Sequence, residues 1–277
     1  MKITVRKRFL RGVLWCVLAI LGLLMIIPFL WTISASLKTN TEIFSVPFHW
    51  IPETFHWENY VKIWTEIPFL TYYLNTLKIA VIVTVGQVLT SSLAAYSFAK
   101  MNYPGRDKVF LCYLATMMIP FHAIMIPQFI MVKNFGLYDS HWALIILETF
   151  SALGVFIMRQ YMLGIPNELS EAARIDGCGE LAIYSRIIMP ICKPALATLT
   201  IFSFNFAWND YMGPLIYLTS DNLKTIQLGL ASFRSLYRTD YSLIMAGTIC
   251  SLLPMVLIFI FAQKYLIEGI SFSGLKG

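Results

Sequence analysis

Polar side chains interrupt one apolar stretch of the chain, residues 194–218, and their types suit binding chemistry with a small molecule. On a helix, Asn205, Trp208 and Asn209 share one face, whereas Ser203 and Asp210 share another. Amides beside a planar ring suit the hydroxyl groups and the apolar faces of sugars, which favours the first face for a solute path. The alternative is that these groups only join neighbouring helices, with Asp210 locking one of them.

A second carboxylate, Glu148, lies in the apolar stretch of residues 142–162, at a depth similar to that of Asp210. The two carboxylates are candidates for the walls of an outer vestibule on a solute path. The alternative is that Glu148 extends to the headgroup layer. Carboxylates within a membrane also mark ion and proton routes, so an ion-coupled transporter or channel that uses Glu148 and Asp210 is the alternative function.

A third segment, residues 164–190, has the composition of a docking element rather than a catalytic site. Pro166 can open a helix whose positive end carries Glu168 and Glu171, and on which Leu169, Ala172 and Ala173 are expected to share one face. Gly177 permits a left-handed turn, after which residues 181–188 fold back as a second helix. The residues that we expect to dock on a partner protein are Glu171, Ala172, Ala173, Arg174, Asp176, Gly177, Ile187 and Pro190, the last of which is predicted to end the second helix.

The elements that position these residues are membrane helices. Of the 277 residues, 58% are hydrophobic and only 13% are charged, which is too little polar surface for a soluble domain of this size. Six apolar stretches are long enough to cross a bilayer at roughly 20 residues each. They cover residues 13–33, 77–98, 109–132, 142–162, 194–218 and 243–266. We therefore predict an all-α polytopic membrane protein that forms a single transmembrane domain over residues 1–277.

The orientation follows from the lysine and arginine residues, which concentrate in residues 1–12, in the loops after the second and fourth spans, and at the carboxyl end. Cytosolic loops carry this excess of basic residues. Both termini and the segment 164–190 are therefore predicted to be cytosolic, with a tail at residues 267–277. Because topology explains the net charge of +6, no nucleic-acid partner is expected.

Two other features of the chain have structural interpretations. Residues 39–72 carry Trp50, Trp57 and Trp64, which favours an interfacial segment along the outer membrane surface. A metal site at His49 and His56 is disfavoured, because no nearby cysteine or carboxylate completes a ligand pattern.

Two prolines interrupt the third apolar stretch. Pro120 and Pro127 are expected to break or kink this span, either as a flexible wall of a path or as a simple packing kink.

The pattern E-A-A, three residues, G, nine residues, I-x-L-P resembles the cytosolic coupling loop of permease subunits in binding-protein-dependent ABC importers. Only Met189 departs from it, replacing the usual leucine. The resemblance extends along the chain and points to the carbohydrate branch, in particular to the shorter, six-span permease of the maltose type. It is carried by residues 94–99 with 104–106, 119–120 with 126–127, 208–210 with 214–215, and the glycine-rich end at 274–277.

This resemblance implies a type I importer fold with a cytosolic coupling helix-turn-helix between spans four and five. It also implies three kinds of protein partner besides membrane lipid: a second homologous permease, two ATP-binding subunits that hold ATP and Mg, and an extracellular binding protein that delivers a sugar or oligosaccharide. Glu171 would pair with a basic residue of an ATP-binding subunit, Arg174 and Asp176 would add contacts or stay solvated, and the tail from Gly269 to Gly277 would extend toward these subunits.

The chain itself is expected to bind no cofactor and to be no enzyme, because the sequence contains no G-x-x-x-x-G-K-[ST] motif. The resemblance places it in a bacterial or archaeal cell membrane. The ion-coupled alternative is disfavoured, because the chain lacks an evident inverted repeat and that alternative gives the helix-turn-helix no purpose.

Overall fold

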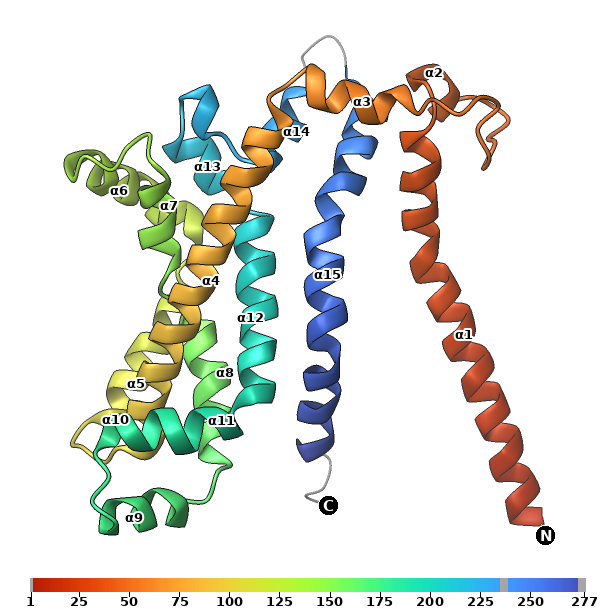
Figure 1. Ribbon diagram of the computed structural model, residues 1–277. Helices are drawn as coiled ribbons and strands as arrows, with labels where there is room; N and C mark the ends of the chain where they lie inside the picture. Colours follow the sequence, from red (N-terminus) through yellow and green to blue (C-terminus); the bar gives the residue numbers. More distant parts are fainter. Residues whose placement is uncertain (1, 235–238, 274–277) are drawn as a thin grey trace. The chain divides into compact units, whose positions relative to one another are not determined.

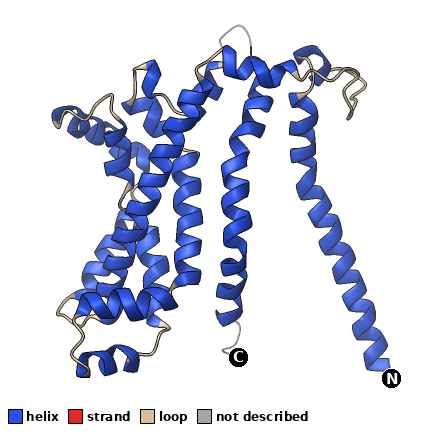
Figure 2. Cartoon of the chain, viewed as in Figure 1, coloured by secondary structure: helices blue, strands red, loops and turns tan. Residues whose placement is uncertain are grey.

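The computed structural model describes residues 2–234 and 239–273, and its regular elements are helices (Figures 1 and 2). The chain divides into two compact units. The first contains residues 1–69 and 230–252, and the second contains residues 70–229 and 253–277.

The first unit contains a long helix, α1 (Lys2–Ser36), which is an apolar candidate span from Leu10 onward; its most apolar part is not buried, whereas Ala35 and Ser36 at its end are. It also holds α2 (Asn40–Ile43), α3 (Glu58–Thr65) and the first part of α15 (Tyr241–Ser273). Asn59 holds the end of α1, because its Nδ2 donates to the carbonyls of Ser36 and Lys38 at 3.0 Å each. The backbone N–H of Tyr241 at the start of α15 donates to Asn40 Oδ1 at 2.8 Å.

The segment between α1 and α4, residues 37–68, exposes aromatic side chains. Trp50, Trp57 and Trp64 are 52%, 63% and 43% exposed. The two nitrogens of His56 contact Glu58 Oε1 at 2.6 Å and Thr54 Oγ1 at 2.9 Å. Among the described residues, no three or more histidine, cysteine, aspartate or glutamate side chains form a group that could hold a metal ion. The exposed rings suit a headgroup layer, and the interfacial placement stays a prediction.

The second unit contains most of the helices, which Figure 1 labels. In chain order they are α4 (Phe69–Lys100), α5 (Arg106–Ala115), η1 (Thr116–Met118), α6 (Phe121–Asn134), α7 (His141–Glu148), α8 (Ala152–Leu163), α9 (Glu168–Ile175), α10 (Glu180–Ile183), η2 (Tyr184–Ile188), α11 (Met189–Ile191), α12 (Lys193–Trp208), α13 (Met212–Tyr217), η3 (Asp221–Leu223) and α14 (Ile226–Ser232). Phe69, the first residue of α4, and the end of α14 from Leu230 onward belong to the first unit.

The core of the second unit joins α4, α5 and α8 to the helices that follow Gly179. Met158, Met162, Ile183 and Ile188 are fully buried in it. A buried hydrogen bond of 2.7 Å between Ser92 and the Tyr184 hydroxyl crosses the same core. Burial of apolar surface therefore fastens the segment after the turn to the membrane helices.

Four described helices are long and apolar enough to cross a membrane, and six spans result if each of two bent pairs is one span. The prediction of an all-α polytopic fold is confirmed. One bent pair shows the break expected in the apolar stretch 109–132, because its two helices, ending at Met118 and beginning at Phe121, meet at 97°. Pro120 stands at this break as the N-cap of α6, whereas Pro127 is accommodated inside α6.

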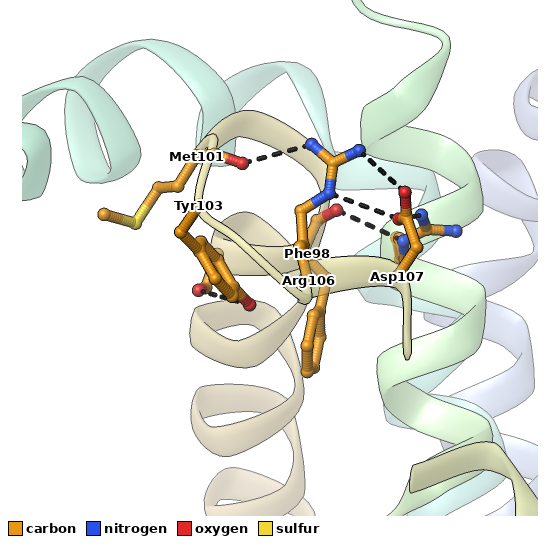
Figure 3. A network of polar contacts seen from close by, with 7 residues as sticks. Phe98, Met101, Tyr103, Arg106 and Asp107 are labelled. Carbon is orange, nitrogen blue, oxygen red and sulfur yellow. Dashed lines mark hydrogen bonds and ion pairs between the residues drawn. The ribbon is translucent and has the colours of Figure 1, made fainter. Parts of the chain in front are cut away.

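The turn between α4 and α5 is fixed by arginines (Figure 3). Arg106 donates to the Met101 carbonyl at 3.1 Å and pairs with Asp107 at 3.2 Å. Arg159 of α8 donates to Asp107 at 2.9 Å and to the Phe98 carbonyl at 3.2 Å. Gly105 adopts a φ of +81°, which an L side chain rarely does. This network ties α4, α5 and α8 together at the end of α4.

The predicted tail at residues 267–277 has two parts. Residues 267–273 continue the helix α15, and residues 274–277, with the glycine-rich end, lie outside the described residues.

Candidate functional site

The coupling segment, residues 164–192, is a pair of helices joined by a tight turn (Figure 1). Gly177 provides the turn with a φ of +82°, and the amides of Gly177 and Cys178 donate to the carbonyls of Arg174 and Ala173, which closes the end of α9. The second helix is continuous through α10, η2 and α11, and α12 leaves it at an angle of 83°.

Two details of this segment differ from the sequence prediction. Pro190 does not end the second helix, because it lies in the first turn of α11, where a missing N–H costs no helical hydrogen bond. The second helix ends at Cys192 instead, which is the C-cap of α11. Ala173 is buried together with Ser170, whereas Leu169 and Ala172 are exposed, so the small residues do not share a face.

The outward face of the coupling segment is apolar and uncovered. Ile175 is 86% exposed, Leu181 75% and Leu169 43%, with Glu171 and Asp176 exposed beside them. Ile187 is half-buried and Pro190 is exposed. Exposed large apolar side chains are typical of surfaces that meet another protein, and the docking role of these residues stays a prediction.

A polar cluster fixes the angle between the two helices of the coupling segment. Arg174 of α9 donates from Nε to Glu180 Oε1 at 2.7 Å and from Nη2 to Oε2 at 3.3 Å. The hydroxyl of Tyr96, on α4, donates to Glu180 Oε2 at 2.5 Å. The carboxylate of Glu180 raises the pKa of Arg174, so this arginine stays charged. Glu180 therefore connects both helices of the segment to a membrane helix.

Lys100 holds the entrance of the coupling segment. Its Nζ donates to the Ile165 carbonyl at 2.6 Å and to Asn167 Oδ1 at 2.9 Å. Because Lys100 is the last residue of α4, the same helix anchors the segment at two places, through Lys100 and through Tyr96.

A cavity of about 660 Å³ lies within the second unit. Its walls come from places where helices are interrupted: between η1 and α6, between α7 and α8, and between α12 and α13. Irregular backbone in a membrane protein is tolerated where it is covered by protein or lines a cavity. The interruptions and the cavity are therefore one structural feature.

Glu148 and Asp210 both line this cavity. Asp210 also accepts from the backbone N–H of Gly213 at 3.2 Å. Glu148 Oε2 is shielded from solvent and has no hydrogen-bond partner. The two carboxylates thus share one site, as their similar depth in the sequence indicated, although neither the contact nor the cavity is readable from spacing.

Gln87 of α4 is a cavity residue that the sequence analysis did not single out. Its Oε1 accepts from Ser203 Oγ at 2.6 Å and its Nε2 donates to the Glu148 carbonyl at 2.6 Å. The available signal was a glutamine, the one side-chain amide in the span of residues 77–98.

The arrangement of α12 corrects the predicted helix face. The helix ends at Trp208, so Asn209 is its C-cap and Asp210 lies beyond it. Trp208 is 1% exposed and packs on Phe204 and Tyr73, whereas the Asn209 amide donates to Asn205 Oδ1 at 2.8 Å at an exposed position. The cavity is lined by Phe202, Ser203 and Phe206, which lie beside the face of Asn205 and Asn209, and the path role of the Asn205 face stays a prediction.

Fold, interrupted helices and cavity define a polytopic transport permease, and the comparisons with known proteins identify its family. Residues 86–271 match the model of the binding-protein-dependent transport system inner membrane component. The chain belongs to this family and is a permease of the ABC importer type. An ion-coupled transporter or channel, the alternative function, is not favoured.

Similar proteins extend the match over nearly the whole chain. It is 34% identical to the arabinooligosaccharides transport system permease protein AraQ of Halalkalibacterium halodurans, over 94% of each chain. It is 33% identical to the lactose transport system permease protein LacG of Rhizobium radiobacter, over 97% of this chain and 98% of that one. In fold it resembles a bacterial ABC transporter involved in the import of the acidic polysaccharide alginate, with a TM-score of 0.81 at 24% identity, over 94% of this chain and 97% of that one.

Proposed function

We propose that this chain is one of two permease subunits in an ATP-driven importer of a sugar or oligosaccharide. Two relatives carry the names of arabinooligosaccharide and lactose transport permeases, which supports a carbohydrate solute. The observation that carries the proposal is the coupling segment, because it presents uncovered apolar side chains on a rigidly anchored element.

In this proposal the outward face of the coupling segment docks on an ATP-binding subunit, with one such subunit for each permease. Glu171, Ala172, Arg174, Asp176 and Gly177 lie on or beside that face. ATP and Mg belong to those subunits, and this chain has neither a nucleotide site nor a cofactor. Docking from the cytosol requires that both termini be cytosolic as well.

The solute path lies between this chain and the second, homologous permease. On this side it includes the cavity with Glu148 and Asp210, and the exposed amides of Asn205 and Asn209 are available to the same path. An extracellular binding protein delivers the solute. Closure of the ATP-binding subunits moves the coupling segment, and its anchors on α4 pass that motion to the helices around the cavity.

The test is purification of the tagged chain from gently solubilised native membranes, with identification of every stoichiometric partner. Recovery of a second permease and an ATP-binding subunit, followed by ATP-dependent uptake of radiolabelled sugar after reconstitution with the binding protein, is the expected outcome. A folded chain recovered repeatedly without an ATP-binding subunit would contradict the proposal. Uptake driven by an ion gradient in liposomes of this chain alone would do the same.

A further inference from the structure

The cavity has an electrostatic character that bears on which solutes can enter it. Three breaks between consecutive helices lie around it, at residues 119–120, 149–151 and 209–211. Interrupted helices at membrane depth commonly form solute or ion sites, because the freed backbone and polar side chains lie beside open space. The chemistry of the groups at these three breaks therefore decides what the cavity accepts.

The strongest polar groups at these breaks are acidic. Glu148 and Asp210 both line the cavity, and Asp210 accepts the backbone N–H of Gly213 at 3.2 Å, a bond that favours its ionised form. Among the described residues that line the cavity, none is lysine, arginine or histidine. The negative charge thus has no basic counterpart in the cavity wall.

The backbone amides at the breaks are also taken. Asp210 accepts from the first turn of α13, with Gly213 N at 3.2 Å. Ser151 Oγ accepts from Gly154 N at 3.0 Å at the start of α8. Amides at the start of a helix are the groups that would otherwise attract an anion. An entering anion would therefore meet carboxyl oxygens and find neither a cation nor free amides at these two helix starts.

A hydroxyl group fits the same surroundings. A hydroxyl can donate to a carboxyl oxygen of the cavity wall, which Glu148 and Asp210 provide, without bringing a charge into the cavity. The remaining wall is mainly apolar and includes the rings of Phe121, Phe150, Phe202 and Phe206. Aromatic faces beside a few polar groups suit a sugar ring, which has an apolar face and a rim of hydroxyls.

We propose that the Glu148–Asp210 cavity is an electronegative selectivity element that admits uncharged, hydroxyl-rich solutes and excludes anionic ones, such as uronates and sugar phosphates. The proposal deepens the proposed function, on which it rests for the cavity being part of the solute path. It assigns to this permease a discrimination by charge, in addition to whatever the binding protein contributes.

The charge of the cavity is measured directly by cysteine labelling of the assembled importer in membrane vesicles. The variant Phe206→Cys places a thiol in the wall, and the unmodified chain, with its five cysteines, is the background control. Labelling rates are compared for a cationic and an anionic methanethiosulfonate, each relative to its rate with a free thiol. We expect the cationic reagent to be favoured about tenfold, the size that one unpaired charge at an intermediate dielectric gives.

The matched variant carries Glu148→Gln and Asp210→Asn in addition. These amides keep the side-chain shapes and remove the charge, so the ratio of the cationic to the anionic labelling rate should fall toward one. The thermal midpoint of each sample identifies any misfolded variant. A parent chain without cationic preference would overturn the proposal, and this measurement does not depend on the double variant. A preference unaffected in a folded double variant would also overturn it.

The solute side is tested with a matched pair of probes, lactose and its carboxylated derivative lactobionate. Slower labelling of Phe206→Cys in the presence of lactose, with no effect of lactobionate, is the expected result. Equal protection by both probes, or none by lactose, would overturn it. Because labelling needs no ATP, a failure of ATP-driven uptake would count against the proposed function without altering the measured charge of the cavity.

Discussion

The coupling segment and the cavity are both polar regions of one compact unit, yet they satisfy their polar groups in opposite ways. In the coupling segment, Glu180 is paired on both oxygens by Arg174 and Tyr96, while the apolar side chains point outward. In the cavity the apolar side chains form the wall, and a carboxyl oxygen of Glu148 is left without a partner.

The difference teaches which kind of partner each region accepts. An element with saturated polar groups and uncovered apolar ones gains free energy by burying apolar surface, which is what a protein surface offers. A shielded acceptor without a donor gains by receiving a hydrogen bond, which is what a small polar solute offers. Each prediction below changes one side of this contrast.

The largest effect is expected from Gly177→Val in the turn of the coupling segment. A β-branched residue is strained at a φ of +82°, although no atom lies within 4 Å of the added Cβ. The cost of roughly 1–2 kcal/mol reshapes the turn and with it the docking face. We expect loss of at least about tenfold in uptake, with ATP hydrolysis no longer responsive to substrate.

The control for this prediction is Gly179→Ala, where φ is −73° and the added Cβ meets open space. It should transport at the parental rate. Gly177→Asn separates two causes, because asparagine tolerates a positive φ: recovery of uptake assigns the defect to the turn, and continued failure assigns it to close approach of the partner. Substrate-stimulated hydrolysis and uptake both unchanged in Gly177→Val would show that the turn is not part of the coupling.

A smaller effect, on stability, is expected from Gly213→Ala beside the cavity. The new Cβ would lie 2.3 Å from Asp210 Oδ2 and 2.9 Å from Leu144 Cδ2, so Asp210 must move. Overpacking of this kind costs about 1–3 kcal/mol. The measurement is the thermal midpoint of the purified complex, which should fall by several degrees. A midpoint within error of the parent would show that Asp210 is not held in this position.

The next effect concerns transmission between the two regions. Glu180→Gln keeps a hydrogen-bonding group for Tyr96 but removes the charge that holds Arg174, so the angle between α9 and α10 loosens. The pair is partly exposed, which limits its contribution to about 1 kcal/mol or less. We expect uptake to fall a few-fold while basal ATP hydrolysis is kept.

Tyr96→Phe is the partner variant for a double-mutant cycle with Glu180→Gln. Because both residues act through one contact, their effects on uptake should not add. Strictly additive effects would show that Tyr96 and Glu180 act separately and that α4 does not receive motion from the coupling segment.

The smallest effect is expected from Ser203→Ala, which removes the donor to Gln87 Oε1. A neutral hydrogen bond contributes about 0.5–1.5 kcal/mol, and Gln87 retains its bond to the Glu148 carbonyl. The thermal midpoint should fall slightly and uptake should persist. A large loss of uptake at unchanged stability would place Ser203 in direct contact with the solute.

Prediction from sequence was more complete for the coupling segment than for the cavity. The turn at Gly177 was readable, because one glycine between two short helical patterns has few other interpretations. The end of the second helix could not be read from the sequence. Pro190 lies directly after the π-helical turn η2, at a position where its missing N–H is tolerated, and the sequence does not announce that turn.

The cavity was only partly foreseen. Glu148 and Asp210 were singled out as intramembrane carboxylates, but Gln87 was overlooked and the path was expected on the face of Asn205, Trp208 and Asn209. That expectation assumed a helix through residue 210, whereas α12 ends at Trp208 and the ring of Trp208 packs in the interior.

The sequence alone determined the membrane class, the all-helical fold, the family and the helix-turn-helix at residues 164–190, because these depend on composition, on local periodicity and on motifs that are contiguous in the chain. Only the tertiary structure decided which polar residues meet. Glu148 and Asp210 are 62 positions apart in the sequence, and their contact depends on where α7 and α12 break and how they pack. Helix ends within a membrane are set by packing against neighbouring helices, and the residues at those ends do not specify that packing by themselves.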